Sequence, residues 1–417
     1  MTGTYFRRLV RTGFLLFFLA VLVTASGNGD HRPIALDSLV APHRYNVVSW
    51  ELSHFPDKWV HKLGDVFSGI NPLAKGPPDA AQRRAQVREF FNLGRELQNL
   101  ELQITAENSG LGRIAPEVAI QIRRIEKQRE AMREDVEETV ESEMGAVLNL
   151  EGFSSWPGLI FPPVDTHFSN PPGVLVLSPR DRIFRLKTIV LRPELTNQEK
   201  ERLEDMVLGE EDLSALVVEI SGIATFPSIV SERGDLRRAL DAVAHEWLHH
   251  WFFFKPLGQG FWDSPQMTTL NETAATIGGM EMGALAHAAI TGEPAVRKLV
   301  PPRDPFGASR SFDFDGAIRE TRLRTEELLA QGEIPEAEDY MEKRRRLLVD
   351  QGFRIRKINQ AFFAFRQSYA TDPGSISPID AQLRELRQRS DSLEDFLKTV
   401  AGFGSYSEFL EHLASDL

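Results

Sequence analysis

The sequence of 417 residues predicts an α+β fold that is mostly helical. Three short runs rich in Val, Ile and Leu, at 174–177, 183–191 and 213–220, have the length and the Pro, Asp or Gly flanks of β-strands. Helix-forming segments surround them, over 79–148 and over most of the chain after 235. We therefore expect a small sheet packed among many helices.

The composition is that of a globular protein in which cysteine has no role. Hydrophobic residues make up 42% of the chain and charged residues 26%, which is enough to build a buried core. Because cysteine is absent, a transition metal would have to be held by histidine and carboxylate. The formal net charge of -12 repels phosphate backbones and argues against nucleic acid as a partner.

Residues 1–26 have the order of a secretory signal. Arg7, Arg8 and Arg11 precede an apolar run at 14–23, which small and polar residues follow. The run is shorter than the roughly 20 residues of a membrane-spanning helix, so a cleaved signal is favoured and a short membrane anchor stays open. The protein is expected to be exported across the cytoplasmic membrane, to a periplasmic, extracellular or membrane-anchored location.

The chain after this leader is predicted to form three regions. Residues 27–153 are an N-terminal helical region, with one or two helices within 31–62 and a hairpin over 79–148 that is broken at 108–112. A Pro-rich stretch opens a second region at 154–300. After a Pro-rich loop, 301–417 form a C-terminal helical lobe with helices at 315–331, 336–371, 378–391 and in the tail.

Within the second region, an extended segment leads into two helices. Residues 221–230 contain Pro227, which points to an edge strand or to the end of a strand. Asp235 offers an N-cap for a helix over 236–254, which ends before a Lys-Pro-Leu-Gly stop signal. A second apolar helix is predicted from about residue 268 to 290.

The first of these helices carries the motif His245-Glu246-Trp247-Leu248-His249. Two histidines at positions i and i+4 lie on one face, about one turn apart, so both imidazoles can reach one metal ion. Glu246 lies beside them, where it can act on a water molecule without being a ligand. The spacing therefore predicts a metal site with a nearby general base.

A catalytic zinc site needs a third protein ligand and a free position for water. Glu272 follows His249 by 23 residues, in an apolar and nearly carboxylate-free part of the second helix. A carboxylate buried there is costly unless it binds something. Glu272 is thus the predicted third ligand, although a helix N-terminal carboxylate favoured by the dipole remains the rival explanation.

These residues resemble the gluzincin metallopeptidases, the group that includes thermolysin and aminopeptidase N. The match covers about residues 210–290 and lies at His245, Glu246, His249, Asn271 and Glu272. The Asn-Glu-Thr-Ala-Ala-Thr segment and the later 358–361 region with Tyr369 are similar to bacterial proteins described as aminopeptidases. The resemblance implies a zincin-like catalytic core with a small sheet and an active-site helix.

The resemblance also implies a zinc-dependent metallopeptidase that cleaves peptide bonds by Glu-assisted attack of metal-bound water. His245, His249 and Glu272 would hold Zn²⁺, and Glu246 would be the general base. Gluzincins use a Tyr or His as a second oxyanion donor, and of the candidates Tyr45, Tyr340, Tyr369 and Tyr406 we favour Tyr369. The partner would then be a peptide or protein substrate.

Two departures from the family pattern matter. Thermolysin has an acid one turn after its glutamate ligand, where this chain has Thr276. The residues that hydrogen-bond to the metal ligands must therefore differ from those of thermolysin. Asp241 is a possible substitute, and a surface or capping role is the alternative. Residues 221–231 lack the carboxylate with which aminopeptidase N holds a free amine, so exopeptidase and endopeptidase both stay open.

A protein of another class would fit part of this pattern. A non-catalytic zincin-fold scaffold could keep the metal site and use its long helices to bind a partner at the membrane. Glu246 argues against that reading, because a binding module has no need of a general base. The substrate, the cleavage preference and the oligomeric state do not follow from the sequence.

Overall fold

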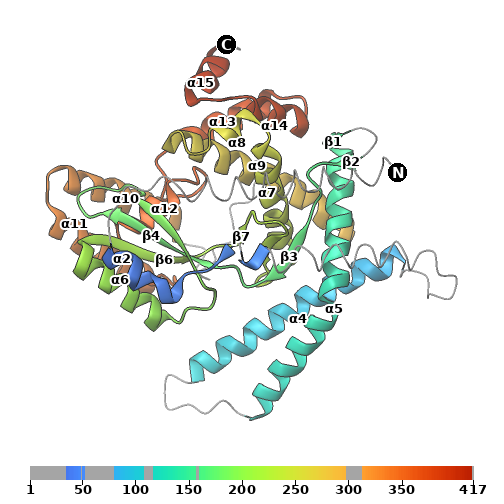
Figure 1. Cartoon of the computed structure of the whole chain (residues 1–417), viewed down its shortest axis with the longest axis horizontal. Helices are drawn as coiled ribbons and strands as arrows, with labels where there is room; N and C mark the ends of the chain where they lie inside the picture. Colours follow the sequence, from blue (N-terminus) through green and yellow to red (C-terminus); the bar gives the residue numbers. More distant parts are fainter. Residues whose placement is uncertain are drawn as a thin grey trace, which may run out of the picture.

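The computed structural model describes residues 34–47, 49–51, 79–107, 116–155, 159–296 and 312–415. Within these ranges the fold is α+β and mostly helical, and its strands form small sheets (Figure 1). The predicted fold class is confirmed at this level. The predicted leader, 1–26, and the hairpin break at 108–112 lie outside the described residues. None of the helices in these ranges is both long and apolar enough to cross a membrane.

One antiparallel sheet of three strands lies between two layers of helices. Its order is β5-β4-β6, with β4 (Gly173–Pro179) between β5 (Lys187–Leu191) and β6 (Leu213–Glu219). Side chains of β4 alternate between two hydrophobic clusters, as the two-residue period of a strand requires. One face packs on α2 (Ile34–Val40) and α6 (Asn197–Glu211), and the other on α12 (Gln360–Arg366).

The predicted strand at 183–191 is wrong in its first residues. The strand begins at Lys187, because the preceding residues form the hairpin turn from β4. There the Ser178 hydroxyl accepts a hydrogen bond from the Phe184 N–H at 3.2 Å, and Leu186 N–H donates to the Leu177 carbonyl at 2.9 Å. The apolar side chain of Ile183 packs on the cluster around α12 instead of joining a strand.

A second sheet leads into the helices of the predicted site. Its order is β3-β8-β7, in which β3 (Thr166–Ser169) runs parallel to β8 (Ser228–Ser231) and β7 (Gly222–Ile223) runs antiparallel to it. The extended segment predicted at 221–230 is found as two strands, β7 and β8, joined by a bend at Thr225–Pro227. β7 is the edge strand of this sheet, and β8 lies at its centre. A separate pair, β1 (Ser154–Ser155) and β2 (Leu159–Ile160), is antiparallel.

Two helices at the centre carry the predicted metal ligands. They are α7 (Leu236–Phe253) and α9 (Pro265–Thr291), linked by the short α8 (Pro256–Gln259). Asp235 caps α7 by accepting from the Arg238 N–H at 2.9 Å, as predicted, and Ser264 caps α9 by accepting from Met267 N–H at 3.1 Å. These caps fix where each helix begins, and so which way its side chains point.

The backbones of α7 and α9 pack in direct contact. A Cβ atom on Gly279 would lie 2.9 Å from the Asp241 carbonyl oxygen and 3.1 Å from the backbone nitrogen of His245. Only glycine permits this approach, because real Cβ contacts are longer. The glycine therefore sets the short separation that lets side chains from the two helices meet.

The hydrophobic core around α7 and α9 is continuous over the three predicted regions. It contains Phe90 of α4 (Ala80–Glu107), Met144 of α5 (Pro116–Leu150), Trp247, and Phe396 of α14 (Leu393–Ala401). The boundaries at 153 and 300 stay predictions, and the buried cluster extends across both. Figure 1 shows α4 and α5 as an antiparallel pair whose far ends project from the body, which agrees with the predicted hairpin.

The C-terminal region is helical, with one error in the prediction. The helices are α10 (Phe314–Ala330), α11 (Ile334–Asp350), α12, α13 (Ile379–Arg389), α14 and α15 (Tyr406–Ser415). The single helix predicted over 336–371 is wrong, because α11 ends before Gly352, whose φ of +94° is left-handed. Asn359 then caps α12 by accepting from the Phe362 N–H at 3.0 Å.

Candidate metal centre

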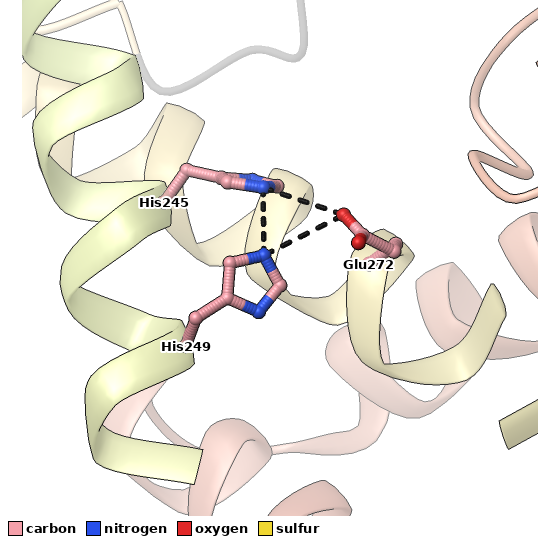
Figure 2. Close-up of side chains that lie close together, drawn as sticks. All are labelled: His245, His249 and Glu272. Atoms are coloured by element: carbon pink, nitrogen blue, oxygen red, sulfur yellow. Dashed lines mark hydrogen bonds and ion pairs between the residues drawn. The ribbon is translucent and has the colours of Figure 1, made fainter. Parts of the chain in front are cut away.

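The three predicted ligands converge on one point between α7 and α9 (Figure 2). The Nε2 atoms of His245 and His249 are 3.0 Å apart. Each lies 3.5 Å from the same carboxylate oxygen, Oε2 of Glu272. The prediction that these side chains lie together is confirmed, and the group could hold a metal ion.

The triangle of donor atoms has the size that a tetrahedral metal site needs. Zinc bonds of roughly 2.0–2.1 Å place ligand atoms about 3.3 Å apart in a tetrahedron, close to the three separations found here. Oε2 of Glu272 is buried and accepts no hydrogen bond from the residues that the structure describes. A cation would satisfy this oxygen, and the two imidazoles complete a donor set of two nitrogens and one oxygen.

Asn271 orients His249 for this task. Its Nδ2 donates to the Leu257 carbonyl at 3.4 Å, which leaves Oδ1, 3.0 Å from His249 Nδ1, as an acceptor. An amide oxygen can only accept, so His249 must carry its proton on Nδ1 when neutral, and the lone pair on Nε2 faces the other ligands. Asn271 is 1% exposed, and its buried amide fixes both the tautomer and the angle of the ring.

Charge interactions within the site are strong. Burial raises the pKa of Glu272, but the charges of His249 and His245 and their hydrogen bonds together hold it well below its ordinary value. Burial lowers the pKa of His249, but the charge and hydrogen bond of Glu272, the charge of Glu246 and the hydrogen bond with Asn271 together raise it to about 9. A proton on Nε2 and a metal ion compete for one lone pair, so metal binding at this site displaces a proton.

Glu246 lies beside the ligands, beneath the edge strand β7. It is 6% exposed, and its Oε1 would lie 2.5 Å from a Cβ atom on Gly222. Gly222 therefore leaves the space that the carboxylate occupies. Burial raises the pKa of Glu246, the charges of His245 and His249 lower it, and the charge of Glu272 raises it, with a net increase.

Tyr369 reaches the site from the turn after α12. The Ala370 N–H donates to the Thr273 hydroxyl at 3.0 Å, which ties this turn to α9 one residue beyond Glu272. Burial, followed by the negative charges of Glu272 and Glu246, raises the pKa of the Tyr369 phenol well above its ordinary value. The structure thus brings the phenol, still carrying its proton at neutral pH, close to both carboxylates.

Asp241 contacts Arg237 and does not orient a histidine. Its Oδ1 accepts from the Arg237 Nε at 2.7 Å, and Arg237 also donates to the Met280 carbonyl at 2.8 Å. Burial raises the pKa of Asp241 to about 6, against the opposing effect of Arg237. Neither of the two roles considered for Asp241 is found: its carboxylate pairs with Arg237 where α7 meets α9, and the contact that orients His249 comes from Asn271.

Two features of the site escape sequence reasoning. The role of Asn271 depends on a carbonyl at position 257, and that of Gly222 depends on how β7 crosses α7. The Asn-Glu pair in the sequence is a usable signal for Asn271, since the amide directly precedes a ligand. For Gly222 the sequence offers only a glycine in an extended segment, which by itself is weak information.

Comparisons with known proteins do not place the chain in a family. No protein-family model, curated protein or solved structure matches it. The geometry of the site itself is therefore the basis on which its chemistry can be inferred.

If the site holds a divalent metal ion, substitution Asn271→Ala is expected to weaken its binding by roughly 10- to 100-fold, because the ring of His249 loses its fixed orientation. The measurement is competition against a chromophoric zinc chelator. Thr276→Ala is the control, since that hydroxyl donates to the Glu272 carbonyl of its own helix and not to a ligand side chain. Equal zinc affinities for wild type and Asn271→Ala would contradict this role.

Proposed function

We propose that the protein is a zinc-dependent metallopeptidase with a zincin-like catalytic core. The observation that carries the proposal is the position of Glu246, a buried carboxylate next to His245, His249 and Glu272 that is not itself one of the converging ligands. A structural metal site is closed by four protein ligands, whereas a catalytic one has three and an open position. Three ligands with an adjacent base fit the catalytic kind.

Zinc is the metal that the donor set favours. Two imidazoles and one carboxylate suit a borderline cation, while Mg²⁺ and Ca²⁺ prefer sites made of oxygen. When bound, zinc supplies a Lewis acid that polarises a carbonyl and makes water acidic near neutral pH. His245, His249 and Glu272 would hold it, with Asn271 supporting the ring of His249.

Glu246 would take the proton of the attacking water and pass it to the leaving amine. Its raised pKa suits both steps, because a general base works best when its pKa is near the working pH. The space beneath Gly222 lets the carboxylate stay close to the ligands without joining them. The negative charge of Glu246 raises the pKa of His249, as does the negative charge of Glu272.

Tyr369 would stabilise the oxyanion of the tetrahedral intermediate. A phenol with a raised pKa remains a hydrogen-bond donor at neutral pH, which is the form that this task requires. Its turn is tied to α9 beside Glu272, so the donor is positioned before substrate binds. Pre-positioned donors are the effective ones, because they need no reorganisation during the reaction.

The edge of β7 offers a place for the peptide backbone. One side of β7 pairs with β8, and the other pairs with no strand among those described. Farther along, Thr225 N–H donates to the Ile223 carbonyl and Phe226 N–H donates to Glu51 Oε1, at 2.8 and 3.3 Å. Strand addition is therefore confined to β7 itself, at 222–223, where Gly222 lies over Glu246.

The test is hydrolysis of a mixed peptide library with free and blocked ends, before and after zinc removal. We expect cleavage by the zinc-loaded protein, loss after treatment with a chelator, and recovery when one equivalent of zinc is returned. Mass spectrometry of the products distinguishes removal of terminal residues from internal cleavage. A non-catalytic metal-binding protein would bind zinc and leave the whole library intact, and that result would refute the proposal.

A further inference from the structure

The segment between α8 and α9 carries two aromatic residues next to the metal centre. The ring centroid of Phe261 lies 6.4 Å from that of His249, with the planes at 81°. The ring of Trp262 lies 4.6 Å from that of Phe261, at 74°. A row of rings in contact therefore starts at a metal ligand and leads outward.

This row ends in solvent. Trp262 is 80% exposed, although a tryptophan ring is among the largest apolar surfaces that a side chain can bury. Together with Phe261, which contacts the ligand His249, this ring offers apolar surface beside the candidate metal centre. Phe261 is partly buried between the two, so it connects the exposed ring to the ligands.

The backbone holds the pair in place. Phe261 N–H donates to the Gly258 carbonyl at 3.3 Å, and the Phe261 carbonyl accepts from the Thr268 hydroxyl at 2.7 Å. The segment is thus tied at one end to α8 and at the other to the first turn of α9. A surface fixed in this way loses little conformational entropy when a ligand binds.

We infer that Phe261 and Trp262 form the subsite for a large apolar or aromatic side chain of the substrate, next to the bond that is cleaved. The inference rests on the proposed peptidase function and adds a preference to it. β7 covers Glu246, and Phe261 contacts His249, so the two elements border different parts of one site.

The kinetic test compares two hexapeptides, Ala-Gly-Phe-Phe-Gly-Ala and Ala-Gly-Ala-Ala-Gly-Ala. For Trp262→Ala we expect the KM of the Phe peptide to rise about five- to tenfold, with kcat and the KM of the Ala peptide little changed. Trp262→Phe keeps an aromatic ring and should restore most of the affinity. Leu323→Ala, an exposed apolar residue on α10, is the control.

A binding test does not depend on turnover. Zinc-loaded Glu246→Gln protein is titrated with each hexapeptide while tryptophan fluorescence is followed. The Phe peptide should shift the emission, and the shift should vanish in the double variant with Trp262→Phe. If the Phe peptide shifts the emission no more than the Ala peptide does, or if Trp262→Ala changes neither KM, the subsite assignment is wrong. If wild type cleaves no peptide, the proposed function fails while the titration still decides the subsite.

Discussion

Glu246→Gln is expected to lower kcat by about a thousandfold while leaving the zinc content at one ion per chain. The amide has nearly the shape of the carboxylate, so it fits beneath Gly222, but it cannot accept a proton. It also removes a buried negative charge, so the folded protein should not be destabilised. The measurement is steady-state hydrolysis of the best library peptide, together with metal analysis of the same sample.

A matched control separates this effect from a general loss of charge. Glu293→Gln changes an exposed glutamate just after α9 and should leave kcat and zinc content unaltered. If Glu246→Gln keeps both zinc and full activity, Glu246 is not the base. If it loses zinc, Glu246 acts in holding the metal, which the arrangement of the three ligands does not predict.

Glu272→Ala is expected to weaken zinc binding by more than the 10- to 100-fold typical of an outer-shell residue. The change removes one of three donors and leaves two imidazoles, which also bind Ni²⁺ and Cu²⁺ well. It should lower the pKa of His249 from about 9 as well, because the carboxylate that raises it is gone. Zinc affinity is measured by chelator competition, and the pKa by NMR of the imidazole protons in zinc-free protein.

The control for this prediction lies on the same helix. Glu281 is buried and forms a two-bond ion pair with Arg387, at 2.9 and 3.0 Å. Glu281→Ala should reduce the free energy of unfolding, because it leaves Arg387 unpaired, and should keep the zinc affinity of wild type. Unchanged zinc affinity in Glu272→Ala would remove Glu272 from the site.

The parts of the site that could be predicted from the sequence are those set by local geometry. The i, i+4 spacing places His245 and His249 on one face wherever the helix forms, and Asp235 marks where it begins. Glu272 could be assigned because an isolated carboxylate in an apolar helix needs a partner. Each of these inferences uses either residues that are close in sequence or the free-energy cost of burying a carboxylate without a partner.

The remaining features depend on contacts between distant segments. Gly279 sets the approach of α7 to α9, Gly222 makes room for Glu246, and Thr273 ties the turn that carries Tyr369. Nothing in the local sequence around these residues says which segment they will meet. For Tyr369 only the family resemblance pointed to this part of the chain, and its role as oxyanion donor stays a proposal.

The error in the late helices has a different origin. Residues 336–371 are rich in helix formers, and Gly352 alone does not suffice to predict an end at that point. The helix ends there because a left-handed residue closes its last turn, and the chain then packs Phe353 into the core beside α12. Tertiary packing of one aromatic residue thus overrides the propensity of its neighbours.

Anomalous diffraction at the zinc absorption edge, from crystals grown with one equivalent of zinc, tests the central claim most directly. We predict a peak about 2.0–2.2 Å from Nε2 of His245, Nε2 of His249 and a carboxylate oxygen of Glu272, with a fourth position taken by solvent. A zinc-containing crystal without density at this point, with Glu272 turned away from the two imidazoles, would contradict the account.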